Sequence, residues 1–235
     1  MAMNKALKEV IKNMLSPEQI ATAHKIKSAI LGKPKKEKIK RLPLSHFGPP
    51  FRLHLGCGNV VLDGFCNVDI MDESTVDFVD DISTLSKFKK NSVSEIYSCH
   101  VLEHFSHEEI LPILTKWFEV LAPGGILRIS VPDIDRIVRV YHKNFAHFEK
   151  PGHTPWIGLI YGGQTTPYDF HKTGFNFCWL KYLLEQVGFQ DCQEYPHEPH
   201  FVPGTTDGSL VKEPFGEFLS LNMMAIKPKN SLSAN

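Results

Sequence analysis

Two glycines and an acid have the residue types and spacing of a nucleotide-binding site. Gly56 and Gly58 directly follow an apolar run at 51–55, and Asp69 lies at the end of the next run, 65–70. Glycine lets the backbone turn tightly and come close to a ligand, because no Cβ stands in the way. If the two runs are neighbouring parallel strands, the acid lies beside the glycine turn, where it could bind the hydroxyl groups of a ribose.

The glycine pair alone does not specify which nucleotide is bound. A dinucleotide fingerprint requires a third glycine three residues after Gly58 and an acid about 20 residues further on. Val61 occupies the first of these positions, and Asp69 comes too early for the second. The sequence contains no Walker A pattern either. NAD(P) and P-loop nucleotides are therefore disfavoured.

The hydrophobic pattern predicts the elements that position these residues. Strands are expected at 51–55, 65–70, 76–79, 94–99, 126–131, 189–195 and 218–226. Helices are expected at 107–121, 134–144 and 177–187, and further helices within 4–31. Alternating strands and helices indicate an α/β fold, namely a Rossmann-like doubly wound sheet of about seven strands, mostly parallel with an antiparallel final strand.

The chain is expected to divide into three parts. Residues 1–45 read as a helical N-terminal extension followed by a basic linker, and 46–228 as the main domain. Within this domain, about 145–176 form a long segment rich in glycine, proline and aromatic residues, which predicts a lid-like insert. Residues 229–235 are expected to be a disordered tail.

Composition excludes several classes of function. Lys+Arg and Asp+Glu both number 26, so no charge imbalance indicates nucleic acid as a partner. The 5 cysteines contain no CxxC pair, which disfavours a disulfide framework or a cysteine zinc knuckle. Neither a signal peptide nor an apolar run long enough to span a membrane is present, so a cytoplasmic protein is expected.

Ligands of parallel sheets bind at the carboxyl ends of the strands. This rule gathers segments from five expected strands on one rim: Gly56–Gly58, Asp69, Asp80–Asp81, Cys99–His100 and Pro132–Asp133. The rim is therefore where a cofactor and a substrate should meet.

Several of these segments have a specific joint pattern: Leu55-Gly-Cys-Gly58, Gly64-Phe-Cys-Asn-Val-Asp69, Asp80-Asp-Ile82, His100-Val-Leu-Glu-His104 and Ala122-Pro-Gly-Gly-Ile-Leu127. Over about 51–226 the chain resembles the class I S-adenosylmethionine-dependent methyltransferases. With Tyr161-Gly-Gly-Gln164 and His171-Lys-Thr-Gly-Phe175, it is similar to a group of small bacterial members, some linked to surface-sugar pathways. Two features differ from the common family pattern: His54 replaces an acid, and the crossover after Gly56 is short.

The resemblance implies S-adenosyl-L-methionine as the cofactor and methyl transfer to a small acceptor, with O-methylation of a sugar or related molecule as the leading case. It also implies roles for individual positions. The residues expected to contact the cofactor are Gly56, Cys57 and Gly58 at the methionine part, Asp69 and Ile70 at the ribose, Asp81 and Ile82 at the adenine, and Cys99 and His100 below the methyl group.

A hydroxyl acceptor would need a general base, and histidine has a suitable pKa near neutral pH. His171 and His100 are the candidates, with Asp133 behind them. A phosphate or carboxylate acceptor already carries charge and needs no base. The sequence leaves open whether the acceptor is phosphorylated or sugar-linked, and whether the protein is a homodimer.

Two alternative functions remain. The chain could be a non-catalytic, cofactor-binding accessory protein, because a fold alone does not establish chemistry. The segment His100-Val-Leu-Glu-His104 also matches the H-x-x-E-H pattern of inverted zinc peptidases, with His100 and His104 as ligands and Glu103 as the base. His100 is expected at a strand tip and not in a helix, which disfavours this zinc hydrolase, and no metal site is assigned.

Overall fold

A computed structural model of the chain describes residues 47–144, 156–212 and 216–229. The helices and basic linker expected within 1–45 lie outside these residues, as do the start of the expected insert, 145–155, and the end of the tail, 230–235. Within the described ranges, no helix has the length and apolar character needed to cross a membrane.

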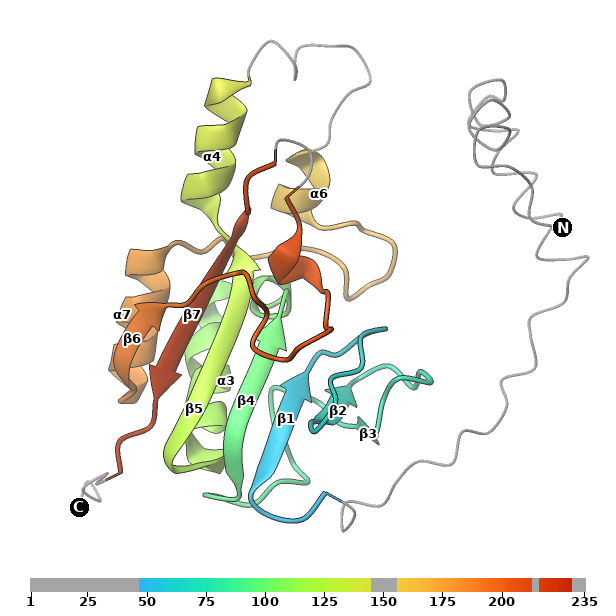
Figure 1. The fold of residues 1–235 in the computed structure, drawn as a ribbon, viewed down its shortest axis with the longest axis vertical. Helices are drawn as coiled ribbons and strands as arrows, with labels where there is room; N and C mark the ends of the chain where they lie inside the picture. The colour runs from blue at the N-terminus through green and yellow to red at the C-terminus, as the bar shows by residue number, and fades with distance from the viewer. Residues whose placement is uncertain (1–46, 145–155, 213–215, 230–235) are drawn as a thin grey trace, which may run out of the picture. The chain divides into compact units, whose positions relative to one another are not determined.

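Seven strands form one sheet in the order β3-β2-β1-β4-β5-β7-β6 (Figure 1). Their bounds are β1 Phe51–Leu55, β2 Cys66–Asp69, β3 Phe78–Val79, β4 Val93–Cys99, β5 Leu121–Pro132, β6 Gln190–Glu194 and β7 Ser220–Ile226. Each pair of neighbours is parallel except that β7 is antiparallel to both β5 and β6. The Rossmann-like sheet with an antiparallel final strand is thereby confirmed.

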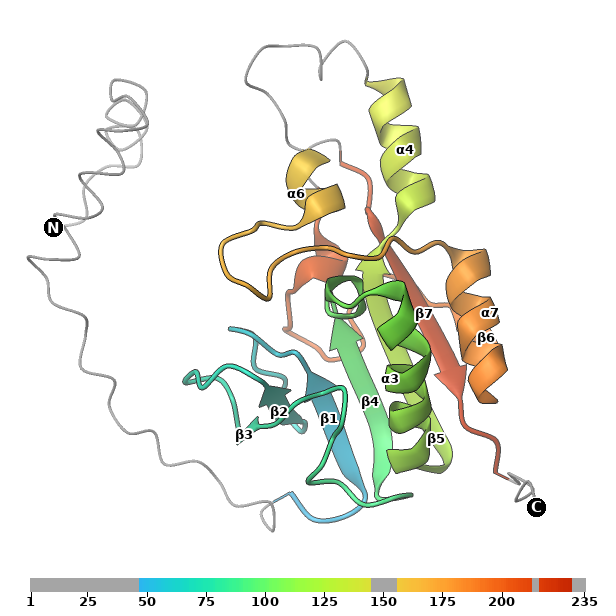
Figure 2. The ribbon, with the colours of Figure 1, turned by 180° about the vertical axis from the view of Figure 1, so that it is seen from behind.

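The helices of the described residues are α3 His107–Val120, α4 Ile134–Lys143, α6 Trp156–Tyr161 and α7 Phe177–Val187, with short 3-10 turns η2 Leu102–His104 and η3 Gly208–Leu210. Three of the four α-helices match predicted ones. The exception is α6, which lies in the segment expected to be a loop and is too short for a clear periodic pattern. Figure 2 shows α3 and α7 on the same face of the sheet.

Helix α3 forms where an N-terminal cap precedes a row of apolar residues. The Ser106 side chain and Glu109 form a capping box, which satisfies amide groups of the first turn. The residues that α3 buries are Ile110, Ile113, Leu114, Trp117 and Val120. They pack on Leu53 and Ile96 of the strands, so the main core lies between the sheet and this helical layer.

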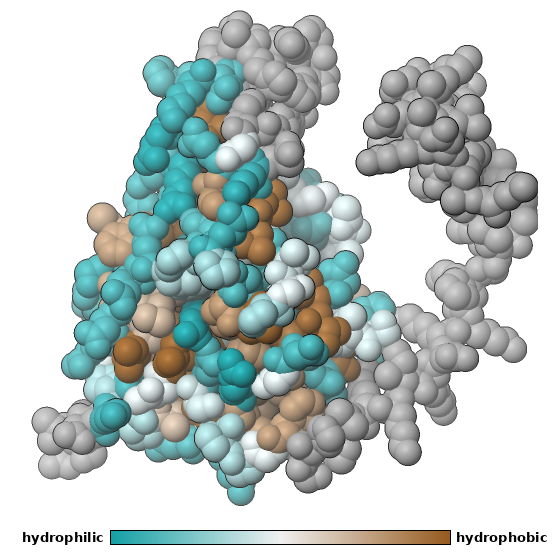
Figure 3. Space-filling model, viewed as in Figure 1, coloured by the Kyte–Doolittle hydropathy of each residue, from teal (hydrophilic) through white to brown (hydrophobic). Residues whose placement is uncertain are grey.

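The opposite face of the sheet differs from a typical doubly wound fold. The crossover 56–65 from β1 to β2 contains turns and no helix. The segment between β6 and β7, here called the C-terminal insert (196–212), crosses the strands instead (Figure 1). Its Val202 packs with Tyr97 and Phe65 in a second apolar cluster. Figure 3 shows apolar surface in the middle of this face.

A buried hydrogen-bond network attaches the C-terminal insert to β4. The Tyr97 hydroxyl donates to Oδ2 of Asp207 at 2.6 Å, and the Ser209 hydroxyl donates to Oδ1 at 2.6 Å. Nε2 of His200 lies 3.4 Å from Oδ2. Burial alone would raise the pKa of Asp207, but these hydrogen bonds outweigh it and hold that pKa well below its usual value.

Replacing Asp207 by Asn should therefore destabilise the fold at neutral pH. We expect a loss of about 1–3 kcal/mol in the free energy of unfolding, because the charged acceptor of buried donors is removed. A depressed pKa stabilises the folded state above the unfolded pKa of about 4 and loses this effect as the pH falls. The difference between wild type and Asp207→Asn should therefore narrow below about pH 4.

Urea unfolding at a series of pH values measures this difference. Asp63→Asn, at an exposed position of the β1–β2 crossover, is the control and should behave as wild type. A difference for Asp207→Asn that stays constant from neutral to acid pH would contradict the proposed charge network.

Candidate functional site

The turn after β1 needs both of its glycines, but for different reasons. Gly56 has φ +67° and Gly58 has φ +51°, in the left-handed region that favours glycine. A Cβ on Gly56 would lie 2.3 Å from Cγ2 of Val101, whereas a Cβ on Gly58 would have nothing within 4 Å. Gly56 is thus packed against Val101, just after β4, while the backbone at Gly58 borders open space.

Asp69 lies beside this turn, as expected from its position at the end of a parallel neighbouring strand. Its side chain holds the turn, because Oδ2 accepts a hydrogen bond from the Gly58 amide at 2.9 Å. Oδ1 accepts from the Met71 amide at 2.8 Å. An ionised carboxylate has about four acceptor positions, so two remain for the hydroxyl groups of a ligand.

The residues expected at the ribose and adenine beyond Asp69 separate into exposed and buried ones. Ile70 is 44% exposed and Met71 is 42% exposed. No sequence pattern indicated a role for Met71. Both follow Asp69 directly and could cover an apolar ring. Asp81 is exposed and accepts hydrogen bonds from Ser83. The Ile82 side chain is instead buried in the main core.

The cysteines and the histidine near the turn are partly or fully buried. Burial raises the pKa of the Cys57 thiol to about 12, so this thiol is protonated at neutral pH. Burial also raises the pKa of the half-buried Cys99. His54 is buried, and its Nδ1 lies 3.0 Å from Oδ1 of Asn67. Burial lowers the pKa of His54 and favours a neutral ring.

His100 follows β4 in an unusual backbone conformation. Its φ is +54°, which a non-glycine residue adopts at some energetic cost. Its Nε2 lies 2.8 Å from the Ser220 hydroxyl, and a Cβ on Gly208 would lie 2.8 Å from its ring. Burial lowers the pKa of His100 to about 4. The partners at 208 and 220 come from distant parts of the chain, and no sequence pattern indicated them.

Glu103 lies close to this ring and is itself 1% exposed. Its Oε1 is 3.4 Å from Nδ1 of His100. Neither carboxylate oxygen has a hydrogen-bond partner in the described part of the chain. Burial raises the pKa of Glu103 to about 8, so the carboxyl is mostly protonated at neutral pH.

Two further histidines meet at Glu103. Nε2 of His171 lies 3.9 Å from Oε1 of Glu103, and the rings of His104 and His171 are 4.9 Å apart. The loop that carries His171 is attached by its backbone, because the Lys172 amide donates to the Glu103 carbonyl at 2.7 Å. Burial lowers the pKa of both histidines. We call these residues the histidine cluster: His100, Glu103, His104 and His171.

The histidine cluster does not have the geometry of an inverted zinc peptidase. That geometry requires both histidines of the H-x-x-E-H segment on one helical face. The 3-10 turn η2 begins only at Leu102, and His100 precedes it in the left-handed region. His100 and His104 are therefore not spaced along one helix.

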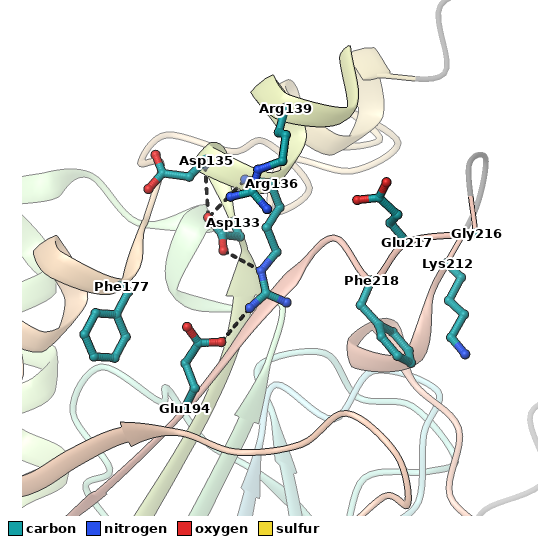
Figure 4. A pocket seen from close by; sticks show the side chains of 10 residues that line it. All are labelled: Asp133, Asp135, Arg136, Arg139, Phe177, Glu194, Lys212, Gly216, Glu217 and Phe218. Atoms are coloured by element: carbon teal, nitrogen blue, oxygen red, sulfur yellow. Dashed lines mark hydrogen bonds and ion pairs between the residues drawn. The ribbon is translucent and has the colours of Figure 1, made fainter. Parts of the chain in front are cut away.

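Asp133 lies at the start of α4 (Figure 4). It caps α4, because Oδ1 accepts from the Asp135 amide at 3.0 Å, and its Oδ2 pairs with Nε of Arg136 at 2.8 Å. Burial raises the pKa of Asp133. Asp133 and Arg136 line a cleft of about 490 Å³ together with Glu194, which also pairs with Arg136. The Asp133 carboxylate is thus used by the helix cap and this ion-pair network.

Comparison with known proteins adds similarity of fold. No protein-family model matches the chain, and no curated protein matches it in sequence. Solved structures of similar fold include an S-adenosylmethionine-dependent methyltransferase from Archaeoglobus fulgidus, at 15% identity and a TM-score of 0.46, which matches 75% of this chain and 86% of that one. Another, from Methanosarcina mazei, has 16% identity and a TM-score of 0.47 over 81% of this chain and all of that one.

A third, from Thermotoga maritima, has 17% identity and a TM-score of 0.45 over 79% of this chain and 84% of that one. At these identities and TM-scores the similarity does not extend to the activity of this chain. The activity has to be inferred from the residues of the site.

The geometry at the two glycines predicts different losses of stability when each is replaced by alanine. Gly58→Ala should lose about 1–2 kcal/mol of stability, because a left-handed conformation is unfavourable for alanine. Gly56→Ala should lose about 1–3 kcal/mol more, because its Cβ also overlaps Val101. Adding Val101→Ala to Gly56→Ala should recover part of that additional loss. Urea unfolding of the single and double variants measures these values.

Val101→Ala alone is the control for the lost methyl groups. Equal losses for Gly56→Ala and Gly58→Ala, with no energetic coupling between positions 56 and 101, would show that the contact between the turn and Val101 is not tight.

Proposed function

We propose that this protein binds S-adenosyl-L-methionine and transfers its methyl group to a small acceptor. The observation that carries the proposal is the glycine turn bonded to Asp69 at the carboxyl ends of β1 and β2. This place lies where the strand order reverses, between β1 and β4, and ligands of open α/β sheets bind at such points. The sequence resemblance to class I methyltransferases supports the same cofactor.

The residues at this place fit the cofactor. Asp69 has acceptor positions left for two ribose hydroxyl groups. Gly58 leaves open space for the methionine part, and the exposed side chains of Ile70 and Met71 can cover the adenine. The cofactor, when bound, supplies an electrophilic methyl group on a sulfonium ion.

The histidine cluster supplies the groups that would prepare the acceptor. Gly56 packs on Val101, between His100 and η2, so the cofactor turn and the cluster are adjacent. Because burial lowers the pKa of His171, its imidazole is neutral at neutral pH and can take a proton from a hydroxyl group. We propose a hydroxyl acceptor, with a sugar as the leading case, and His171 as the residue that accepts its proton.

Asp69→Ala should weaken S-adenosyl-L-methionine binding by about 10 to 150-fold, or about 1.5–3 kcal/mol, because a charged hydrogen-bonding partner of the ribose is lost. Isothermal titration calorimetry measures the affinity. Asp63→Ala, an exposed acid before β2, is the matched control and should bind as wild type. An unchanged affinity in Asp69→Ala would exclude this position as the ribose site.

His171→Ala should retain cofactor affinity but lose turnover by about 10² to 10⁴-fold, which is the usual contribution of general acid–base catalysis. His142→Ala, at an exposed position of α4, is the control. Formation of S-adenosylhomocysteine measures turnover once an acceptor is found. If His171→Ala turns over as fast as wild type across the pH range, His171 is not the proton acceptor.

The experiment that tests the function as a whole is an acceptor screen. The protein is incubated with S-adenosyl-L-methionine and a panel of nucleotide sugars, free sugars and phosphorylated small molecules, and methylated products are identified by mass spectrometry. Methyl transfer to a member of the panel supports the proposal. Tight cofactor binding without S-adenosylhomocysteine formation would favour the accessory protein, and absence of cofactor binding would overturn both.

A further inference from the structure

Three members of the histidine cluster can act as metal ligands. Glu103, His104 and His171 each offer one ligand atom, and these three atoms all lie within 4.8 Å of one another. Glu103 and His104 come from η2, and His171 comes from the loop after α6. We propose that Glu103, His104 and His171 bind a divalent first-row transition-metal ion, with zinc as the probe.

The hydrogen bonds of both rings favour this role. Nδ1 of His171 lies 3.1 Å from the Leu159 carbonyl, and Nδ1 of His104 lies 3.3 Å from the Phe170 carbonyl. A carbonyl oxygen can only accept, so Nδ1 of each neutral ring carries the proton and Nε2 carries the lone pair. Metal-bound histidines are typically fixed by this kind of bond from their other ring nitrogen.

The third ligand is a buried carboxyl group that faces ring nitrogens of His100 and His171 but makes no hydrogen bond within the described residues. Glu103 is 1% exposed, and the described residues provide no hydrogen bond to either of its oxygens. A buried polar group without a partner is unfavourable, and such groups commonly indicate a ligand or an ion. Nε2 of His171 lies 3.9 Å from Oε1 of Glu103, so an ion between them would satisfy both.

The ligand set indicates the class of ion. Two imidazoles and one carboxylate suit zinc and other first-row divalent ions, whereas calcium and magnesium prefer oxygen ligands. Ligand atoms around a tetrahedral ion with bonds of about 2.0–2.2 Å lie about 3.3–3.6 Å apart. The three ligand atoms lie up to 4.8 Å apart, so they must move closer together to bind an ion. Small side-chain rotations can provide this movement. Three protein ligands leave a position open for water or substrate.

The open position gives the ion a use in the reaction, and this part of the inference rests on the proposed function. An oxygen of the acceptor that coordinates the ion becomes more acidic, because the positive charge stabilises its deprotonated form. With the ion bound, His171 Nε2 holds the metal and Nδ1–H donates to the Leu159 carbonyl, so His171 no longer takes the proton. The acceptor hydroxyl would lose its proton to solvent water, and its oxygen would take the methyl group. Acceptors with a hydroxyl group able to coordinate a metal would be preferred.

Metal binding is tested without cofactor or acceptor, so that its outcome does not depend on the proposed function. The full chain is treated with a chelator, which is then removed, and zinc binding is measured by calorimetry and elemental analysis. We expect one equivalent to bind. Glu103→Gln, His104→Ala and His171→Ala should each weaken binding at least tenfold, whereas His142→Ala should bind as wild type.

Hydrogen exchange gives a second, independent result. Zinc should slow exchange of the amides at 161–173 in wild type, because the ion connects the loop to η2, and should not do so in His171→Ala. His171 is only half-buried and lies in a loop, so this variant is informative even if Glu103→Gln does not fold. Equal zinc affinity of wild type and all three ligand variants, or unchanged exchange at 161–173, would overturn the site.

The use of the ion is tested separately. With an acceptor identified, chelation should lower turnover while S-adenosyl-L-methionine affinity stays the same, and added zinc should restore it. Turnover that is unaffected by chelation would overturn the catalytic use of the ion. If zinc binds but no cofactor does, the proposed function fails while the metal site stands.

Discussion

The contact between Gly56 and Val101 is the constraint on which the candidate site depends. Because the side chain of residue 101 fills the space of a Cβ at position 56, the turn after β1 and the segment after β4 can pack only if residue 56 is glycine. Asp69 fixes the other side of the same turn through the Gly58 amide. Three strand ends are thereby held in one arrangement, with the glycine turn on one side and the histidine cluster on the other.

The order of strands and helices followed from the sequence because hydrophobic periodicity is a local property. The carboxyl-end rule also placed Gly56, Gly58 and Asp69 together, since it needs only the direction of the strands. Side-chain partners could not be derived in this way. Two examples are the contact between Ser220 and His100 and the use of the Asp133 carboxylate by α4 and Arg136. Both depend on how β7 and α4 pack on the sheet.

The second face of the sheet is covered differently from that of a typical doubly wound fold. A short crossover from β1 to β2 leaves no helix to cover Tyr97 and its neighbours, so the C-terminal insert covers them. An irregular segment can bury polar groups only if they are hydrogen-bonded. Here the Asp207 carboxylate accepts hydrogen bonds from the hydroxyl groups of Tyr97 and Ser209. The same insert brings Gly208 against His100, so the cover of the sheet also forms one wall of the site.

The loop that carries His171 is attached to Glu103 through backbone atoms, by the amides of Lys172 and Thr173. A backbone bond does not depend on which side chain a residue carries. Most side chains of the segment 161–170 can therefore change while His171 stays in register with η2. Gly162 is an exception, because its φ is +80° and a Cβ there would lie 2.4 Å from the Asp169 carbonyl oxygen. Tyr161, Tyr168 and Phe170 are all more than 40% exposed in this segment. On the proposed function, these exposed aromatic side chains are the place to graft a new acceptor specificity without moving the histidine cluster.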